Sequence, residues 1–497
     1  MMEGLTWDEA IECMSLPQLV ELCERTFREL KVMEGAARSA LYRAKWAAAG
    51  VVPEEVRTYA DLRMVPYTTG GELREAQARN HPDELVCSDG AQLWISTSGT
   101  TGTPKWIPVS LGNLSMIREA FPRIVALMLG VTQDFSVLSI TAPAPFITES
   151  GAYHFLMSHI LNDQHAELTF VALPEALDAL NFARTAQTKG LFAFPSLALV
   201  IAEGVSQRAA EGAREQFRKE RSLRNLLGVL ATSVMRIKAK HVFSFKWGVF
   251  SGEPVDPYRS AIVEAYGLQP SSAYTATEFG TAAAAECKAY NGMHIYLDLC
   301  LPEVIPQAEL EREEADASYV PQAVPLWEAS PGLTGELVLT SFAEALPLVR
   351  YRTSDVIEVV STEPCTCGRT HPRIKVLHRS DDIVNLGLVR FSIYLLKEKL
   401  AEVGVHGQIA NWQLRITRQD YKPKALLLVE PAGEVATEAL VKEIADKIDE
   451  IDGVRQAWEN GLIAQPEVRL VEELVEERTA TGKVKLAIYE DAYFAEA

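Results

Sequence analysis

The segment 97–105, TSGTTGTPK, carries the residue types that bind phosphate groups. It follows an apolar run and combines two glycines and several hydroxyls with one lysine, Lys105. Flexible glycines let neighbouring backbone N–H groups turn toward one anion, while hydroxyls add donors and the lysine adds a positive charge. The spacing differs from the G-x-x-x-x-G-K-[ST] loop of nucleoside triphosphatases. The segment therefore predicts a nucleotide site unlike that of kinases or ATPases, with an ordinary surface turn as the alternative.

Two later segments carry groups that suit the metal and the base of a nucleotide. In SSAYTATEFG (271–280), the hydroxyl of Thr277 stands beside the carboxylate of Glu278. Such a pair suits Mg²⁺, which prefers few carboxylates together with phosphate oxygens and water. SGEP (251–254) follows a strand-like run, at a point where backbone can lie close to a flat base. Each segment alone is also typical of a solvated turn.

Two further groups fit the chemistry of ATP. Asp355, in VRYRTSDVIEV (349–359), stands where a loop joins a strand, so that its carboxylate can accept hydrogen bonds from both ribose hydroxyls. A second Gly-Lys pair, Gly482–Lys483, lies near the C-terminus. A lysine there can stabilise negative charge on phosphate oxygens.

In this order, the segments resemble the adenylate-forming superfamily, which includes acyl- and aryl-CoA ligases, adenylation domains of peptide synthetases and luciferases. The matching segments are TSGTTGTPK (97–105), SGEP (251–254), YTATE (274–278), GEL (335–337), YRTSD (351–355), RSDD (379–382) and TGK (481–483). Within the superfamily, CTCGRTHPRI (365–374) and ECKAYNGMHI (286–295) resemble the phenylacetate-CoA ligase branch.

The resemblance implies a role for each matching residue. Thr277 would contact the α-phosphate, Glu278 would bind Mg²⁺, and Lys105 would lie near the phosphates. The other nucleotide-binding residues that it implies are Thr97, Ser98, Gly99, Thr100, Thr101 and Gly102 at the phosphates, Ser251, Gly252, Glu253 and Pro254 at the adenine, Tyr274 in the same site, and Asp355 and Arg379 at the ribose.

The resemblance also implies a domain rotation about Asp381. Lys483 would enter the site to assist adenylation and withdraw when the pantetheine thiol of coenzyme A enters. A lysine that arrives on a second domain lets adenylation proceed with water excluded. The chain departs from the general superfamily pattern at Thr275 and Ser354, where that pattern has glycine, and near Ser392, where a proline commonly opens a helix. None of these departures removes a charged group.

A cysteine–histidine set raises a separate question. Its members are Cys287, His294, Cys365 and Cys367. Four such ligands suit tetrahedral Zn²⁺, although C-x-C is tighter than the usual C-x₂₋₄-C and His371 is a rival ligand. Ordinary reduced thiols are the alternative. Some members of the resembled family carry zinc at the matching residues, and a zinc with four protein ligands would be structural.

The segments need an α/β scaffold to position them. We expect a helix over residues 17–50, with Leu19, Leu22, Phe27 and Leu30 at helical spacing, and a later helix that has Leu440, Ile444, Ile448 and Ile451 on one face. From about residue 90 to 360, strand-like runs such as QLWIS, FSVLSI and KWGVFS alternate with helical patterns. The acidic stretch ELEREEADASYVPQ is expected on the surface. The sequence predicts a large N-terminal α/β domain with mostly parallel sheets over 1–378 and a small, mobile C-terminal α+β domain over 379–497.

Bulk composition bounds the function. A length of 497 residues predicts two or three domains, and a net charge of −19 argues against a nucleic-acid or anionic-membrane partner. The seven cysteines are unevenly spaced, the N-terminus lacks the pattern of a signal peptide, and no apolar run approaches the length of a membrane span. We expect a cytoplasmic protein. The sequence leaves a homodimer open.

The acid substrate should bind in the middle of the large domain. The residues expected to line its pocket are Phe146, Tyr153, His154, Phe194 and Pro195. Such a lining suits an aryl or small branched acid, and plain core aromatics are the alternative. His154 is not expected to act as a base, because carboxylic acids are already ionised at pH 7.

Three functional hypotheses follow. The first is an AMP-forming ligase that joins a small aryl, branched or hydroxy carboxylic acid to coenzyme A, with ATP and Mg²⁺. The second is an adenylating enzyme that passes the acyl group to a carrier protein or an amine, although no fused carrier domain is visible. The third is a nucleotide-binding protein without activity, which predicts loss of Lys483, Glu278 or Asp355. All three residues are present.

Overall fold

A computed structural model describes the chain except for residues 1–8, 88–92, 97–104, 111–122, 131–135, 142–167, 173–179, 181–182, 196, 200, 203, 206–217, 220, 222–236, 280, 317, 380–382, 387–388, 405–408, 420–421, 434–436, 452, 476–484 and 491–497. The chain forms two compact units, Met1–Val376 and Leu377–Ala497. Within the described residues, no helix is both long and apolar enough to cross a membrane.

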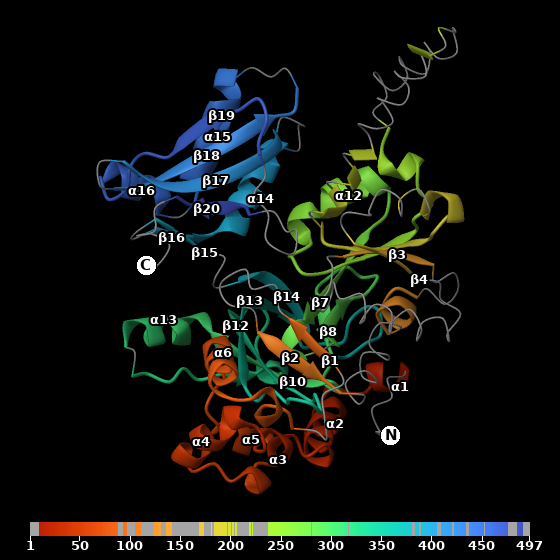
Figure 1. The fold of residues 1–497 in the computed structure, drawn as a ribbon, viewed down its shortest axis with the longest axis vertical. Helices are drawn as coiled ribbons and strands as arrows, with labels where there is room; N and C mark the ends of the chain where they lie inside the picture. Colours follow the sequence, from red (N-terminus) through yellow and green to blue (C-terminus); the bar gives the residue numbers. More distant parts are fainter. Residues whose placement is uncertain are drawn as a thin grey trace. The chain divides into compact units, whose positions relative to one another are not determined.

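The first unit begins with a group of helices (Figure 1). They are α1 (Glu9–Glu12), α2 (Leu16–Glu29), α3 (Val32–Ala36), α4 (Ala40–Ala49), η1 (Pro53–Glu55), α5 (Tyr59–Leu62), α6 (Gly70–Arg79) and η2 (Pro82–Glu84). The single helix expected over 17–50 is therefore wrong, because Lys31 adopts a left-handed φ of 49° that ends α2. The apolar face is as expected: Leu19, Leu22 and Phe27 are buried.

One twelve-stranded sheet runs through this unit in the order β11-β10-β12-β13-β14-β9-β8-β7-β6-β5-β3-β4. Its strands are β3 (Val137–Thr141), β4 (Leu168–Ala172), β5 (Gly190–Ala193), β6 (Trp247–Phe250), β7 (Pro270–Ala276), β8 (Thr281–Glu286), β9 (Met293–Ile295), β10 (Cys300–Pro306), β11 (Val324–Pro325), β12 (Thr334–Ser341), β13 (Tyr351–Ser361) and β14 (Arg373–Arg379). The α/β fold class is confirmed.

Strand direction divides the sheet in two. From β4 through β7 every neighbouring pair is parallel, as the alternation of strands and helical patterns predicts. From β7 to β9 and from β13 to β11 the pairs are antiparallel, which the alternation did not predict. QLWIS forms β1 (Leu93–Ser96), which pairs with β2 (Trp106–Val109) as a separate antiparallel hairpin.

Further helical segments connect these strands. They are η3, a π-helix (Arg123–Met128), η5 (Ala239–His241), η6 (Asp256–Tyr258), α12 (Arg259–Tyr266), η7 (Thr277–Phe279), α13 (Gln307–Ala315) and η8 (Leu326–Glu328). The first half of the acidic stretch expected on the surface lies in α13, a helix with no buried residue, whereas Pro321 of the same stretch is buried.

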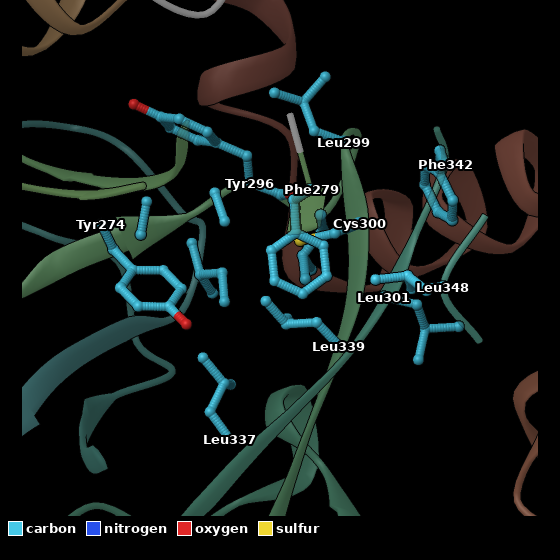
Figure 2. Packing of buried hydrophobic residues seen from close by; sticks show 14 of the residues in the cluster. Tyr274, Phe279, Tyr296, Leu299, Cys300, Leu301, Leu337, Leu339, Phe342 and Leu348 are labelled. Atoms are coloured by element: carbon cyan, nitrogen blue, oxygen red, sulfur yellow. Dashed lines mark hydrogen bonds between the residues drawn. The ribbon is translucent and has the colours of Figure 1, made fainter. Parts of the chain in front are cut away.

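The apolar core lies against the antiparallel half of the sheet. Figure 2 shows part of it, with Leu301 of β10 and Leu337 and Leu339 of β12 among the rings of Tyr274 and Phe279. The side chain of Phe279 is almost wholly buried. Burial of such a ring contributes about 1.5–3 kcal/mol, so it anchors the turn η7 that carries Glu278.

A buried ionic cluster joins three distant segments of the same unit. The guanidinium of Arg123, on η3, donates to the Glu12 carboxylate and to both oxygens of Asp298, at 2.9 and 3.0 Å. It also stacks on the Tyr296 ring, 3.9 Å from the ring centroid. All four side chains are buried. Arg123 therefore compensates charge on both carboxylates, and Arg369 adds a longer ion pair to Glu12 at 3.6 Å.

The second unit is a small α+β domain (Figure 1). Its elements are β15 (Ile383–Leu386), β16 (Val389–Ser392), α14 (Ile393–Gly404), β17 (Ile409–Gln419), β18 (Lys422–Pro431), α15 (Thr437–Asp449), α16 (Val454–Glu459), β19 (Glu467–Leu470) and β20 (Ala487–Tyr489). Four strands form a sheet in the order β19-β18-β17-β20. The expected apolar face of α15 is buried: Leu440, Ile444 and Ile448 belong to this unit's core. Ser392 directly precedes α14.

Candidate functional site

Three side chains from distant parts of the sequence meet beside the antiparallel sheet. The Lys105 ammonium forms an ion pair with the Glu278 carboxylate and donates to the Tyr351 hydroxyl at 2.8 Å. The Tyr351 hydroxyl lies 3.2 Å from Oε1 of Glu278. The Lys105 and Glu278 side chains are only 12% and 13% exposed. Sequence patterns assigned Lys105 and Glu278 to the phosphates and to Mg²⁺ but gave Tyr351 no role.

Each of these residues is placed by a different element. Lys105 directly precedes β2, Glu278 lies in the turn η7 after β7, and Tyr351 opens β13. The Tyr351 ring meets the Phe279 ring edge-on, at 6.2 Å between centroids. Because Phe279 is anchored in the core, the two aromatic rings fix the spacing between Glu278 and the Tyr351 hydroxyl.

The N-terminal helices supply a fourth side of this cluster. Thr68 pairs with the start of β13: its N–H donates to Arg350 O at 2.9 Å and its carbonyl accepts from Arg352 N–H at 2.8 Å. This pairing places Gly70, the first residue of α6, against the cluster. A Cβ at Gly70 would lie 3.2 Å from the Tyr351 hydroxyl and 3.3 Å from Nζ of Lys105. The sequence gave no signal for this approach beyond the glycine itself.

Asp355 is buried and points toward β7. Its carboxylate accepts a hydrogen bond from the Tyr274 hydroxyl. The β12–β13 register shifts between Glu336 and Val338, and a bulge of this kind re-aims a side chain. Ser354 occupies the bulge with φ of 63°, and its N–H donates to Oε1 of Glu336 at 3.0 Å. A left-handed φ favours glycine, which accounts for the glycine of the general pattern at this position.

The start of the GEL segment has a steric requirement. A Cβ on Gly335 would lie 1.9 Å from the carbonyl oxygen of Ile305 on the neighbouring strand β10. Any larger residue would push β10 and β12 apart. Gly335 therefore keeps β12 in the register that, two residues later, produces the bulge opposite Asp355.

The SGEP segment follows β6 at the parallel edge of the same region. The Ser251 hydroxyl lies 2.5 Å from the Thr275 hydroxyl on β7. Gly252 has φ of 81° and is exposed, whereas Glu253 and Pro254 are half-buried. Ser251 thus contacts β7, the strand that carries Tyr274 and leads to Thr277 and Glu278. Thr277 is half-buried.

Other predicted site residues are placed elsewhere or lie outside the described residues. Phe194 and Pro195 follow β5 and are buried, and Phe194 belongs to a core cluster beside the parallel strands. Arg379 ends β14 and is half-buried. The predicted residues that lie outside the described residues are Thr97, Ser98, Gly99, Thr100, Thr101, Gly102, Phe146, Tyr153, His154, Asp381 and Lys483.

The cysteine–histidine set comes together in the large unit. The ligand atoms of Cys287, His294, Cys365 and Cys367 all lie within 4.8 Å of one another. The Cys287 and Cys365 sulfurs are 3.8 Å apart, and the Cys367 sulfur is 3.5 Å from Nε2 of His294. Around a tetrahedral zinc with ordinary bond lengths, two sulfurs lie about 3.8 Å apart and a sulfur and a nitrogen about 3.6 Å apart. The donor set therefore fits zinc.

Hydrogen bonds distinguish His294 from its rival His371. Nδ1 of His294 lies 3.2 Å from the His371 carbonyl, and donation there leaves Nε2 with a lone pair facing Cys367. Burial lowers the pKa of His294 to about 4, so the ring is neutral at pH 7. Nδ1 of His371 instead accepts from Leu297 N–H at 3.3 Å, and its Nε2 lies 3.3 Å from Arg123. The geometry thus selects His294 as the fourth ligand atom.

Over most of its length, this chain is similar to phenylacetate-CoA ligases. No protein-family model matches the sequence. The phenylacetate-coenzyme A ligase of Thermus thermophilus is 25% identical over 427 residues, which cover 84% of this chain and 82% of that protein. The phenylacetate-coenzyme A ligase of Escherichia coli is 24% identical over 404 residues, covering 78% of this chain and 77% of that protein. The predicted resemblance to this branch is confirmed.

Solved structures show the same fold. A 2-hydroxyisobutyryl-CoA ligase in the postadenylation state superposes with a TM-score of 0.74 at 21% identity, covering 100% of this chain and 94% of that one. A GH3.15 acyl acid amido synthetase superposes with a TM-score of 0.63 at 13% identity, covering 97% of this chain and 95% of that one. Likeness at this identity shows the fold alone.

Proposed function

We propose that this chain, a relative of the phenylacetate-CoA ligases with the fold of adenylate-forming enzymes, is an AMP-forming carboxylic acid–CoA ligase. The observation that carries the proposal is the contact of Lys105, Glu278 and Tyr351. At low exposure to water, the lysine can bind phosphate oxygens and the carboxylate beside it can bind a divalent cation.

The first half-reaction joins the acid to AMP. An oxygen of the acid carboxylate attacks the α-phosphorus of ATP, the bond to the bridging oxygen breaks, and pyrophosphate leaves. Thr277 and Lys105 donate to the phosphate oxygens as charge grows on them, and the 97–102 loop adds backbone N–H groups. Glu278 would hold Mg²⁺, which would supply further positive charge at the same oxygens. Asp355 orients the ribose, with its carboxylate held by Tyr274.

The second half-reaction transfers the acyl group to coenzyme A. The pantetheine sulfur attacks the acyl carbonyl, the bond between that carbon and the AMP oxygen breaks, and AMP leaves. We assign Lys483 to the first step and Asp381 to the rotation of the domain 379–497 between the steps. Arg379 would hold the ribose beside Asp355, and Ser251, Gly252, Glu253 and Pro254 would line the adenine.

The acid is a small aryl, branched or hydroxy carboxylic acid. Support comes from two sides. The relatives act on phenylacetate, as their names state, and the similar structure is a 2-hydroxyisobutyryl-CoA ligase. Phe146, Tyr153, His154, Phe194 and Pro195 remain the proposed lining of the pocket. A cytoplasmic location and the absence of nucleic-acid and membrane partners stay predictions.

The test supplies ATP, Mg²⁺, coenzyme A and one acid at a time from a panel that includes phenylacetate and 2-hydroxyisobutyrate. AMP and a thioester should appear in equal amounts with at least one acid. Glu278→Gln should lower the rate by roughly 10²–10³-fold, the cost of removing one electrostatic group from such a site. AMP release with an amine or a carrier protein as acceptor, but not with coenzyme A, would select the adenylating enzyme that uses another acceptor.

We further propose that Cys287, His294, Cys365 and Cys367 hold a structural zinc. The fit of the sulfur and nitrogen separations to a tetrahedral ion supports it. Elemental analysis of the purified protein should find one zinc per chain, and His294→Ala should lose it. His371→Ala should keep the metal, because His371 contributes a carbonyl to His294 rather than a ligand atom. Metal that survives His294→Ala but not His371→Ala would reverse the assignment.

A further inference from the structure

The proposed Mg²⁺ ligand is already paired with a cation of the protein. Glu278 forms its ion pair with Lys105, and both side chains are nearly buried. A divalent cation that binds the same carboxylate must therefore compete with the lysine. Two cations at one carboxylate repel each other strongly where exposure to water is low. Lys105 has to shift away from Glu278 when a Mg²⁺–nucleotide complex arrives.

The Tyr351 hydroxyl is placed to hold Lys105 through that shift. A tyrosine hydroxyl can accept one hydrogen bond while it donates another. Here it accepts from Lys105 at 2.8 Å and is positioned to donate to Glu278 at 3.2 Å. Its ring is buried and fixed against Phe279, so the hydroxyl stays in place while its partners exchange.

We propose that Lys105 is the resting counter-ion of Glu278, that Mg²⁺–nucleotide replaces it, and that Tyr351 is the positioning residue for this exchange. The inference rests on the proposed function in one respect, the use of Mg²⁺–ATP at Glu278. After the exchange, Lys105 keeps its bond to Tyr351 and directs its remaining N–H groups to phosphate oxygens. Glu278 and Lys105 thereby each keep an opposite charge beside them, both with and without the nucleotide.

Gly70 leaves the space that Lys105 and Tyr351 occupy during this exchange. Its missing side chain leaves room for Nζ of Lys105 and for the Tyr351 hydroxyl, which a Cβ would meet at 3.3 and 3.2 Å. Gly71, the next residue of the same helix, has a different setting: its Cβ would meet only the Thr69 hydroxyl, at an ordinary 3.7 Å. Gly70→Ala and Gly71→Ala therefore form a matched pair on one helix turn.

The test measures the dissociation constant of α,β-methylene-ATP twice, once in EDTA and once in excess Mg²⁺. The ratio is the dissociation constant in EDTA divided by the dissociation constant in Mg²⁺. It reports how strongly Mg²⁺ and the nucleotide assist each other's binding to the protein. No acid or coenzyme A is needed. The variants are Lys105→Gln and Tyr351→Phe, which keeps the ring and removes only the hydroxyl. The control is Tyr319→Phe, which removes a hydroxyl that donates to the Glu309 carboxylate on α13.

The two site variants should move the ratio in opposite directions. Lys105→Gln leaves Glu278 without its counter-ion, so binding in EDTA weakens more than binding in Mg²⁺ and the ratio rises. Tyr351→Phe leaves Lys105 more firmly on Glu278, so binding in Mg²⁺ weakens and the ratio falls, by about tenfold for the loss of one hydrogen bond to a charged group. Gly70→Ala should lower it too, and Gly71→Ala and Tyr319→Phe should leave it unchanged.

A ratio that stays constant in Lys105→Gln and Tyr351→Phe would overturn the exchange, because a merely structural role weakens both constants equally. The same ratio shift in both variants would also overturn it. These outcomes are separable from the proposed function. If the protein forms a thioester but the variants leave the ratio unchanged, the ligase function stands and the counter-ion exchange is rejected. If the two variants shift the ratio in opposite directions but no thioester forms, the counter-ion exchange stands and the ligase function is rejected. Failure of the wild-type protein to bind the analogue would reject both.

Discussion

Ser354→Gly should stabilise the protein, although it removes a side chain next to the proposed ribose-binding residue. Ser354 has φ of 63°, a conformation that costs an L-residue about 1–2 kcal/mol. Glycine avoids that cost but loses about 0.5–1 kcal/mol more conformational entropy on folding. The net gain in the free energy of unfolding is therefore about 0.5–1 kcal/mol, a rise of about 1–3 °C in Tm.

Ser272→Gly is a matched control for this substitution. Ser272 is also half-buried in a strand, and its N–H donates to a glutamate, Glu286, at 3.1 Å, much as the Ser354 N–H donates to Glu336. Among the described residues neither serine hydroxyl makes a hydrogen bond. Ser272 lacks the positive φ, so its replacement should destabilise by about 0.5–1 kcal/mol. Equal destabilisation by both substitutions, measured by urea denaturation, would refute the left-handed bulge beside Asp355.

Three further substitutions test the packing around the site. Arg123→Met should cost about 3–5 kcal/mol in urea denaturation, because it removes the guanidinium bonded to the buried Asp298 and leaves Glu12 with its longer pair to Arg369. Arg79→Met, in an exposed pair with Glu75, should cost at most about 0.5 kcal/mol, and equal costs would contradict the buried cluster. Gly335→Ala should lower the free energy of unfolding by about 3 kcal/mol or more, because its Cβ would overlap the Ile305 carbonyl oxygen. A Tm within about 1 °C of wild type would show that β10 and β12 are not so close. Burial opposes ionisation of Asp256, but its bonds to Lys375 and Arg259 outweigh burial and lower its pKa. The Asp256 carboxylate therefore adds at most about 1 kcal/mol to the free energy of unfolding above the unfolded pKa of about 4, and this contribution is lost as pH falls through the lowered pKa. A stability difference between wild type and Asp256→Asn that grows toward pH 3 would contradict this sign.

Residue types and motifs identified two of the residues that meet in the candidate site, but not the packing that positions them. Lys105 and Glu278 were assigned to phosphates and Mg²⁺ from residue type and motif, and the structure brings them into contact. Tyr351 and Gly70 were not found, because an aromatic residue that opens a strand and a glycine that opens a helix are common in any core. Only the pairing of Thr68 with β13 reveals why both positions matter.

The fold was predictable where local pattern decides it. Apolar periodicity identified the buried faces of α2 and α15, since burial requires one apolar stripe. Strand direction depends on partners far along the chain, so the antiparallel half of the sheet could not be read from an alternation of elements. The break at Lys31 was missed for a similar reason, because a left-handed lysine carries no signal of the kind that glycine gives.

Among the cysteines, spacing alone left two histidines as rivals. Cys365 and Cys367 are compatible with either histidine, and the distinction lies in which ring nitrogen faces the sulfurs. That orientation is set by the His371 carbonyl and by Leu297 N–H, two backbone groups whose positions no side-chain pattern encodes.

The central claim, that this chain adenylates a carboxylic acid, is tested most directly by exchange of labelled pyrophosphate into ATP without coenzyme A. Exchange should require both Mg²⁺ and an acid, because pyrophosphate can return to ATP only from an acyl-adenylate. Glu278→Gln should lower the exchange rate by the same factor of roughly 10²–10³. Exchange that proceeds without any acid, or release of ADP and phosphate in place of AMP and pyrophosphate, would contradict the account.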